Sequence, residues 1–393
     1  MSDAFIVTCA RSPIGKFLGG LTDVSATKLG ALAIAEVLKR GKVDPTLVDE
    51  VIMGCVIQAG LGQNPARQSA IHGGLPDTIS AVTVNKVCGS GLQAVMQAAQ
   101  SIRAGDNDVV IAGGFENMSR APYLLQNART GGFKYGDQTA TDAMINDGLW
   151  CAFESCHMGN SAEHIARKHS VSREDQDRFS AKSQQRAAAA WSAGNFAEEV
   201  FPVTVGSGAK AKVVDKDEGI RAETTAEGLS KLRTAFPGGT SVTAGNASTI
   251  NDGSAAILVA SSRGLEKLGS KPIARVVAYA TSGVAPKDIF IAPVSAVNMV
   301  LQKAKLTLAD IDYFELNEAF AAQMLACNYD LKIDEAKLNV NGGAIALGHP
   351  IGASGARCLV TLLSVLKQRN AKRGLVSLCL GGGNAVAMVV ERV

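Results

Sequence analysis

The first half of the chain alternates between apolar runs of helical length and of strand length. Residues 27–43 repeat apolar side chains at helical spacing, and residues 44–57 form a turn followed by a β-rich run. Residues 85–114 then read as a short strand, a glycine-rich turn, an amphipathic helix and a buried strand that ends in glycines. Short apolar strands that alternate with helices predict an α/β unit.

The second half repeats this order of elements. Residues 294–306 have helical spacing and residues 308–316 read as a strand. Residues 338–370 contain a glycine-rich turn and an amphipathic helix, and residues 373–383 form a buried strand that ends in glycines. The recurrence indicates an internal duplication, with two similar α/β layers that face each other. A chance similarity between two generic β/α units is the alternative.

The middle of the chain has a different pattern. Residues 120–149 are rich in glycine and polar side chains, with little periodicity. Two helical stretches follow, and Ser172 with Asp175 three residues later forms a capping-box-like start to the second. Residues 206–240 are again irregular. This predicts an inserted loop domain that covers a ligand, and a merely decorative insertion is the alternative.

These patterns divide the chain into three parts. The expected parts are an N-terminal half of residues 1–119 plus 250–271, an inserted loop domain of residues 120–249 and a C-terminal half of residues 272–393.

Composition narrows the class of protein. The 393 residues are 47% hydrophobic, which supports large buried cores, and 39 Lys and Arg against 36 Asp and Glu leave a formal charge of only +3. So balanced a charge indicates neither a nucleic-acid surface nor a membrane surface, whereas a small anionic ligand needs only a few local cations. No stretch approaches membrane-spanning length, and the first apolar run is too short for a signal peptide.

Cysteine usage points to a reducing compartment. The eight cysteines have no CxxC or Cys/His cluster with metal spacing. We therefore expect no zinc site and no disulfide framework. The chain ends in Glu391-Arg392-Val393, which is no peroxisomal address, so a cytoplasmic location is the expectation.

Three side chains at glycine-rich turns are candidates for acyl-transfer chemistry. Cys88 in NKVCGSG precedes a predicted helix whose positive end lowers a thiol pKa, although a buried structural thiol is the alternative. His349 in GHPIGASGAR lies on a turn and is the best candidate to deprotonate Cys88, a local hydrogen bond being the alternative. Cys379 in CLGGGNA ends an apolar strand, and the residues alone leave open whether it is reactive or belongs to the core.

Seven motifs in order along the whole chain resemble those of the thiolases, in particular the short-chain acetyl-CoA acetyltransferases. They are NKVCGSG, ENMS (116–119), HMG (157–159), TAGNAS (243–248), NEAF (317–320), GGAIALGHPIGASGAR (342–357) and CLGGG (379–383). The resemblance implies a five-layered α/β/α/β/α fold built from two duplicated halves, with an inserted loop domain. It also implies a homotetramer made as a dimer of dimers.

The resemblance assigns catalytic roles. It implies that Cys88 carries the acyl group and that Cys379 exchanges a proton with substrate. The backbone amides of Cys88 and Gly381 would form an oxyanion hole, and Asn317 would hold a water that makes a second oxyanion site with His349. The alternative for Asn317 is a helix N-cap.

Substrate-binding roles follow from the resemblance in the same way. His157 and Met158 would line the acyl and pantetheine pocket, and Ser248 would hydrogen-bond the pantetheine amide. Phe320 would also be a substrate-binding residue. A surface histidine, a packed methionine and a turn serine are the alternatives. Arg221 is a candidate for the phosphates of coenzyme A.

Further charged residues are less clearly assigned. Lys231 and Arg233 are also candidates for the coenzyme A phosphates, but for these two and for Arg221 solvated charges are equally plausible. Glu318 could orient His349 or Asn317, or complement a helix dipole.

The implied activity is that of an acetyl-CoA C-acetyltransferase in lipid metabolism, with coenzyme A thioesters as substrates and no cofactor. It would condense two acetyl-CoA to acetoacetyl-CoA and run the reverse thiolysis. A broad-range 3-ketoacyl-CoA thiolase of fatty-acid breakdown is the main alternative. A decarboxylating ketoacyl synthase typically lacks the second cysteine, and an inactive scaffold would have lost a catalytic residue. Gly228, Thr249 and Asn384 depart from the family pattern and leave substrate preference open.

Overall fold

The duplication predicted from the sequence appears in the strand order of the sheet. A computed structural model describes residues 3–393. The strands of the N-terminal half are β1 (Phe5–Arg11), β3 (Glu50–Gly54), β4 (Ser80–Val84), β5 (Val109–Asn117) and β12 (Asn251–Ala260). Those of the C-terminal half are β13 (Ala274–Gly283), β14 (Tyr313–Leu316), β15 (Arg373–Leu380) and β16 (Asn384–Arg392).

Both halves use the same pairing pattern. β1 pairs antiparallel with β12, β12 antiparallel with β5, and β5 parallel with β3. In the other half, β13 pairs antiparallel with β16, β16 antiparallel with β15, and β15 parallel with β14. The two halves therefore repeat one unit, as the sequence predicted.

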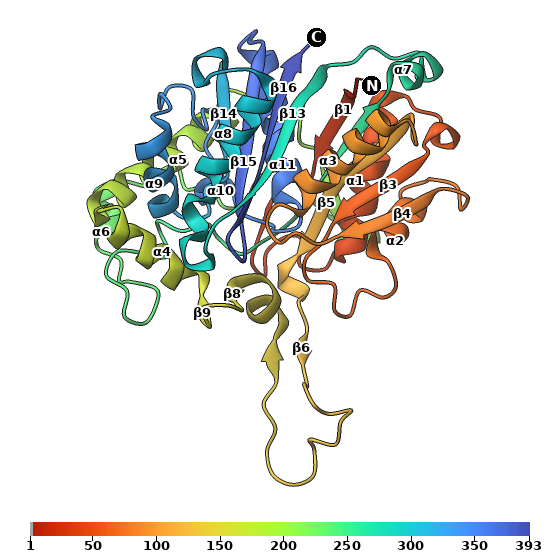
Figure 1. Ribbon diagram of the computed structural model, residues 1–393. Helices are drawn as coiled ribbons and strands as arrows, with labels where there is room; N and C mark the ends of the chain where they lie inside the picture. The colour runs from red at the N-terminus through yellow and green to blue at the C-terminus, as the bar shows by residue number, and fades with distance from the viewer. Residues whose placement is uncertain (1–2) are drawn as a thin grey trace.

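The two halves are joined in one continuous sheet, which the sequence did not predict. β1 also pairs antiparallel with β13, through Phe5 opposite Arg275 and Ile6 opposite Ala274. The resulting order is β14-β15-β16-β13-β1-β12-β5-β3-β4, with the short β2 (Gly15–Lys16) beside β12. Away from this junction the halves diverge, and helices lie between them (Figure 1).

The two central helices are α3 (Ser90–Ala104) and α11 (Ser354–Gln368), and each follows a glycine-rich turn. Residues 354–366 of α11 are all buried, as expected for a helix enclosed on every side. The helices meet at Gly91 and Gly355, where a Cβ on Gly355 would lie 2.5 Å from the Leu92 nitrogen. This close approach brings the turns before both helices, and hence Cys88 and His349, into one region.

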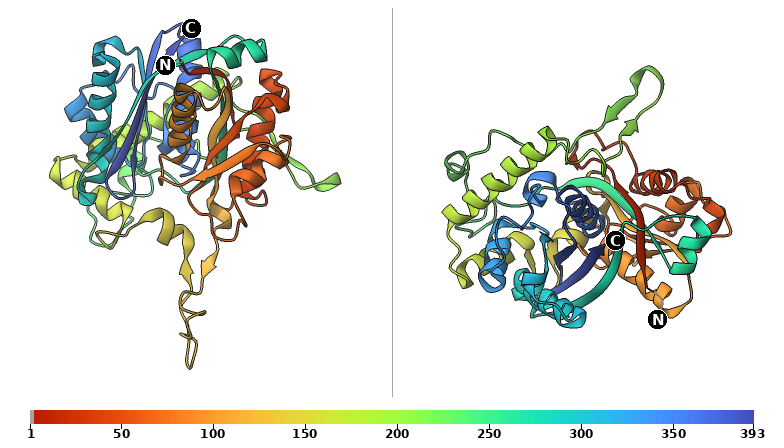
Figure 2. Two further views of the ribbon diagram at one scale, coloured as in Figure 1. Left: turned by 45° about the vertical axis from the view of Figure 1, so that its right-hand side comes forward. Right: turned by 90° about the horizontal axis from the view of Figure 1, so that it is seen from above.

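Outer helices complete the layers. α1 (Ala26–Gly41) and α2 (Pro65–His72) cover the outer face of the N-terminal half, and α8 (Ala292–Ala304) covers that of the C-terminal half. The core between the halves is formed by apolar side chains of α3, α11 and the inner faces of both sets of strands. This is the predicted five-layered α/β/α/β/α arrangement (Figure 2).

Residues 120–249 contain the two predicted helices and three small hairpins. α4 spans Met158–Lys168 and α5 spans Arg173–Ser192, and the Ser172 hydroxyl accepts a 3.0 Å bond from the Asp175 N–H, which confirms the predicted helix start. The hairpins are β6 (Tyr123–Leu124) with β7 (Thr141–Asp142), β8 (Trp150–Cys151) with β9 (Cys156–His157), and β10 (Val203–Val205) with β11 (Lys212–Val214). The first projects far from the body (Figure 1).

The remaining elements are short or peripheral. They are α6 (Ala226–Ser230), α7 (Ser262–Leu268), α9 (Ala321–Leu331), α10 (Ala344–Leu347), the π-helical turn Met144–Leu149, and the 3-10 turns Pro45–Leu47, Met118–Arg120, Gly208–Lys210, Pro286–Ile291 and Leu308–Asp310. Among residues 3–393, no helix is both long enough and apolar enough to cross a membrane.

Candidate active site

One cavity of about 480 Å³ collects residues from both halves and from the inserted segment. Of the ten site residues expected from the sequence, nine line it: Cys88, His157, Met158, Arg221, Ser248, Phe320, His349, Cys379 and Gly381. The tenth, Asn317, lies behind the wall against His349. Residues more than 290 positions apart in the chain therefore share one cavity.

Cys88 lies in a strained turn just before α3. Val87 has φ 47°, a left-handed conformation that a β-branched residue rarely adopts. Ser90 holds the turn, because its hydroxyl accepts a 2.8 Å bond from the Lys86 N–H and donates a 2.6 Å bond to the Val87 carbonyl. A Cβ on Gly89 would lie 2.3 Å from Leu380 Cδ2, so the turn is pressed against the end of β15. Such strain is typical of functional sites.

Burial, rather than the helix end, dominates the acidity of the Cys88 thiol. Desolvation raises its pKa to about 12, against the lowering that the sequence led us to expect. The backbone N–H groups of Cys88 and Gly381 oppose this rise by bonding toward the sulfur. The resting nucleophile is therefore a thiol. The N–H groups of Cys88 and Gly381 both point toward the Cys88 sulfur. They are therefore placed to donate hydrogen bonds to the oxygen of an acyl group that is bound to this sulfur.

His349 is oriented by a hydrogen-bonded serine. Ser354 Oγ donates to the Pro350 carbonyl at 2.8 Å and lies 2.6 Å from His349 Nδ1. Because the serine proton is used, this network assigns the imidazole proton to Nδ1 and leaves Nε2 as an acceptor. Burial, assisted by the positive charge of Arg357, lowers the pKa of His349 to about 3. The ring is thus a neutral base.

Asn317 lies 3.4 Å from that base. Its Nδ2 faces His349 Nε2, and its Oδ1 accepts from Arg357 Nη2, also at 3.4 Å. The amide is thereby aimed with its N–H toward the histidine.

Glu318 contacts neither His349 nor Asn317 by any hydrogen bond among the described residues. Its carboxylate accepts bonds from Ser183 Oγ at 2.6 Å, from Asn339 Nδ2 at 2.9 Å and from the Ile345 N–H at 3.2 Å. It therefore ties α5 to the segment that leads to His349. No hydrogen bond among residues 3–393 supports the interpretation that Glu318 orients His349 or Asn317.

Cys379 ends β15 and is almost fully buried. Burial raises its pKa well above the usual value, and the neighbouring Cys88 adds to that rise. Gly382 and Gly383 have φ of 82° and 85°, so the turn after Cys379 uses a backbone conformation that favours glycine. The two thiols are near neighbours, and neither is charged at rest.

The rest of the cavity wall is largely apolar and includes several aromatic rings. The His157 ring stacks on Phe236 at 4.7 Å and accepts a bond from the Gly159 N–H through Nδ1. Phe320 packs edge-on against Phe290 at 5.1 Å. Such a surface suits an uncharged, chain-like ligand with few polar groups.

The cavity wall also contains cations. Arg221 lines it together with Lys16, which the sequence interpretation did not single out. Lys231 pairs with Glu227 at the surface at 3.3 Å, and neither Lys231 nor Arg233 is among the described residues that line the cavity. Of the three phosphate candidates, Arg221 alone is placed at the cavity.

Three polar residues that position the site were missed from the sequence. Ser354 orients the His349 ring, and Asn251 Oδ1 accepts from the His349 N–H at 2.9 Å. Glu116 accepts from the Gly352 N–H at 2.9 Å, and its burial raises its pKa to about 7. Ser354 and Glu116 both lie inside the quoted motifs, and this position was the available signal.

No group of three or more His, Cys, Asp or Glu side chains suited to a metal ion occurs in residues 3–393.

Comparisons with known proteins agree with this geometry. The profile of the thiolase N-terminal domain matches residues 4–263, and that of the thiolase C-terminal domain matches residues 270–392. A probable acetyl-CoA acetyltransferase of Escherichia coli (strain K12) is 50% identical over 392 residues, covering 100% of both chains. An acetyl-CoA acetyltransferase of Cupriavidus necator is 50% identical over 393 residues, again covering 100% of both.

A solved structure is similar throughout. The crystal structure of the Bacillus anthracis acetyl-CoA acetyltransferase superposes with a TM-score of 0.97 at 41% identity, covering 100% of this chain and 99% of that one. The strand order, the two central helices and the match along the whole length lead to one conclusion: this chain belongs to the thiolase family.

Proposed function

We propose that this thiolase is an acetyl-CoA C-acetyltransferase, which condenses two acetyl-CoA to acetoacetyl-CoA plus CoA and runs the reverse thiolysis. One observation carries the proposal: Cys88, His349, Cys379 and the N–H groups of Cys88 and Gly381 meet at a single cavity. The names of the relatives at about 50% identity support the same substrates.

The first half-reaction is acyl transfer to Cys88. His349 Nε2 takes the thiol proton as the sulfur attacks the thioester carbonyl, and the N–H groups of Cys88 and Gly381 stabilise the oxyanion. When the tetrahedral intermediate collapses, the bond between the acyl carbon and the coenzyme A sulfur breaks. His349 gives its proton to that sulfur, and coenzyme A leaves as a thiol. Since both groups begin uncharged, no resting ion pair has to be broken.

The second half-reaction forms a carbon–carbon bond. Cys379 releases its thiol proton to solvent and, as thiolate, removes a proton from the methyl carbon of a second acetyl-CoA, whose carbonyl oxygen is stabilised on the His349 and Asn317 side of the cavity. The carbanion attacks the acetyl carbonyl on Cys88, and the Cys88 sulfur leaves. Cys379 keeps the proton that it removed, and the Cys88 thiolate takes a proton back from solvent, so both groups end as the thiols with which the cycle began.

The wall residues provide the binding surface in this proposal. His157, Met158 and Phe320 contact the acyl and pantetheine chain, Ser248 bonds a pantetheine amide, and Arg221 faces the phosphates. The substrates are themselves the coenzyme A thioesters, so the proposed reaction needs no cofactor. We place the enzyme in the cytoplasm, where its eight free thiols suit a reducing environment.

The test is direct detection of the acyl-enzyme. Mixing the protein with acetoacetyl-CoA in the absence of free CoA should leave one acetyl group per chain on the tryptic peptide of residues 87–103, in which Cys88 is the one cysteine. Peptide mass spectrometry gives the readout. Acetyl on another cysteine, or an active enzyme that never becomes acetylated, would overturn the assignment.

We further propose a homotetramer whose dimers meet through the projecting β6–β7 hairpin, in the inserted domain of residues 120–249. The hairpin exposes Tyr123 by 68%, Leu125 by 55% and Tyr135 by 100%, and exposed apolar groups on an extended arm usually mark contacts. Shortening residues 128–136 should give dimers that keep activity, measured by sedimentation velocity and a thiolysis assay. A tetramer unchanged by the deletion would refute this location.

A further inference from the structure

Two cysteines outside the proposed chemistry lie opposite each other in a short hairpin. β8 and β9 pair antiparallel, with Cys151 directly across from Cys156 and Trp150 across from His157. Residues directly opposite in such a pair have Cα atoms roughly 4.5–5.5 Å apart and side chains on one face. A disulfide spans Cα separations of about 4.4–6.8 Å, so this pair is within bonding range.

The two thiols differ in access. Cys151 is 2% exposed and belongs to the apolar cluster that contains Met158 and Cys379, whereas Cys156 is partly exposed and packs against that cluster. Cys151 Sγ accepts from the Glu154 N–H at 3.4 Å, and Cys156 Sγ lies 3.7 Å from Ser161 Oγ. Cys156 is therefore the thiol that a dissolved reagent reaches first, with Cys151 beneath it as the resolving partner.

The hairpin is built into the wall of the active site. Leu149 just before β8 and His157 at the end of β9 both line the cavity. At the hairpin tip, a Cβ on Gly382 would lie 3.2 Å from Phe153 Cε2, so the tip reaches the glycine turn after Cys379. A change in the conformation of residues 151–156 would therefore be felt both at the cavity wall near His157 and at the glycine turn after Cys379.

We propose that Cys151 and Cys156 form a reversible disulfide by exchange with a low-molecular-weight disulfide such as oxidised glutathione. The Cys156 thiolate attacks one sulfur of the reagent, and the other leaves as a thiol. The Cys151 thiolate then attacks the Cys156 sulfur of the mixed disulfide, and the second thiol leaves. Two protein thiols are oxidised, one disulfide is reduced to two thiols, and both protons end on the leaving thiols.

The bond would staple the hairpin across its base. It would fix the tip that carries Phe153 and the strand that carries His157, and so restrict adjustment of the cavity wall during turnover. A 1 Å misplacement remote from the reacting atoms can cost an enzyme about 10²-fold in rate. We expect the oxidised protein to be severalfold slower in thiolysis, and a reductant such as dithiothreitol to restore it.

Peptide mapping tests the bond without any need for turnover. After incubation with excess oxidised glutathione, the protein is digested at acid pH with a protease that cleaves after Glu154, which lies between the two cysteines. The pieces on either side should stay joined until dithiothreitol is added. Cys156→Ser should abolish this linkage, and Cys9→Ser, which changes a partly buried thiol on β1, should leave it intact. Two free thiols, or glutathione held on Cys156 without linkage, would overturn the proposal.

Kinetics then tests the link to the site. The comparison is between wild type and Cys156→Ser, each treated with oxidised glutathione, with peptides confirming that Cys88 and Cys379 are unmodified. A rate loss that appears in wild type alone and is reversed by dithiothreitol supports the coupling, and a linkage formed without any rate difference overturns it. If both reduced proteins lack thiolase activity, that result counts against the proposed function and leaves the mapping result standing.

Discussion

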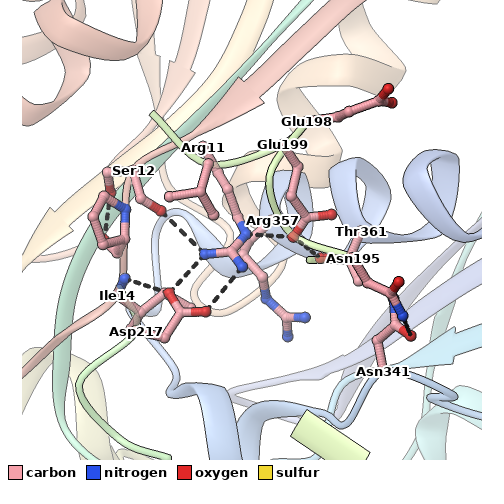
Figure 3. Close-up of polar contacts among 12 residues, drawn as sticks. Arg11, Ser12, Ile14, Asn195, Glu198, Glu199, Asp217, Asn341, Arg357 and Thr361 are labelled. Atoms are coloured by element: carbon pink, nitrogen blue, oxygen red, sulfur yellow. Dashed lines mark hydrogen bonds and ion pairs between the residues drawn. The ribbon is translucent and has the colours of Figure 1, made fainter. Parts of the chain in front are cut away.

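The active-site cavity and the cluster around Arg11 are both buried, but the ionisable groups of the cluster are charged and the catalytic groups of the cavity are neutral. Arg11 is fully buried and keeps its charge, because Nε lies 2.6 Å from Glu199 Oε1 and the two terminal nitrogens lie 2.7 and 2.9 Å from the oxygens of Asp217 (Figure 3). These carboxylates raise the pKa of Arg11 above its usual value despite desolvation. In the cavity, by contrast, burial leaves Cys88 as a thiol and His349 as a neutral ring.

The difference lies in the partners that each region supplies. Asp217 also accepts from the Ile14 N–H at 2.8 Å and from Trp191 Nε1 at 3.3 Å, so its charge is fully solvated by protein groups. The Cys88 sulfur meets two backbone N–H groups, while burial and then the negative charge of Glu116 raise its pKa. Buried charge persists where it is paired, and buried acid–base groups without such pairing stay neutral and available for proton transfer.

Arg357 stands between the two regions. It is buried, lies 3.8 Å from Glu315 Oε2, and has no hydrogen-bond partner for Nε and Nη1 among the described residues. Its charge helps to keep His349 neutral while Nη2 bonds Asn317. A loosely paired cation here serves the site through electrostatics rather than through a tight ion pair.

The largest expected effect is the loss of condensation and thiolysis activity when the Cys379 thiol is removed. Cys379→Ala should slow condensation and thiolysis by about 10²–10⁴-fold, the usual contribution of a positioned acid–base group. It should still acetylate Cys88 from acetyl-CoA, since that step uses Cys88, His349 and the backbone donors. Stopped-flow acylation beside steady-state thiolysis measures both. His349→Ala is the control that should lose acylation too, and turnover within a few-fold of wild type in Cys379→Ala would make Cys379 a packing residue.

Removing the buried positive charge of Arg11 should instead lower the stability of the folded protein. Arg11→Met leaves Glu199 and Asp217 buried without a counter-charge and should lower the free energy of unfolding by about 3–5 kcal/mol. Urea denaturation at fixed protein concentration gives this value.

The neighbouring glutamate provides a matched control. Glu198 pairs with Lys367 at 2.7 Å with both side chains more than 60% exposed, so Glu198→Gln should change the free energy of unfolding by less than about 1 kcal/mol. Equal effects from Arg11→Met and Glu198→Gln would contradict the contrast between buried and exposed pairs.

A smaller expected effect is the pH dependence of Cys88 alkylation, which tests whether this buried residue is a neutral thiol at rest. Because its pKa is raised to about 12, the thiolate fraction should increase roughly tenfold per pH unit up to pH 10 and beyond. Iodoacetamide labelling of the peptide of residues 87–103 measures this, with free N-acetylcysteine as the reference. A high rate that is flat from neutral pH upward would instead indicate a resting thiolate–imidazolium pair.

Much of the architecture was predictable because short stretches of sequence determine its elements. The glycine-rich turns before α3 and α11, and the buried strands β5 and β15, appear as short runs of sequence and predicted the duplicated halves. The junction of β1 with β13 was not predictable in this way. It rests on two residue pairs from segments about 270 positions apart, and no local periodicity encodes such pairing.

The site shows the same division. Cys88, His349 and Cys379 stood out because each interrupts a glycine-rich or apolar run. The raised pKa of Cys88 was missed, because burial depends on surfaces that distant segments bring together. Ser354 and Asn251 were missed for a similar reason, since a serine or asparagine has no distinctive spacing until its partner is known.

The pairing of β1 has a consequence for synthesis on the ribosome. Both neighbours of this first strand, β12 and β13, begin roughly 240 to 260 residues after β1 ends. At a translation rate of about 5–20 residues per second, β1 waits on the order of tens of seconds for either neighbour. During that time the apolar strand Phe5–Arg11 emerges with unsatisfied backbone groups on both edges. The nascent chain must therefore stay shielded from aggregation until more than two thirds of it has been made.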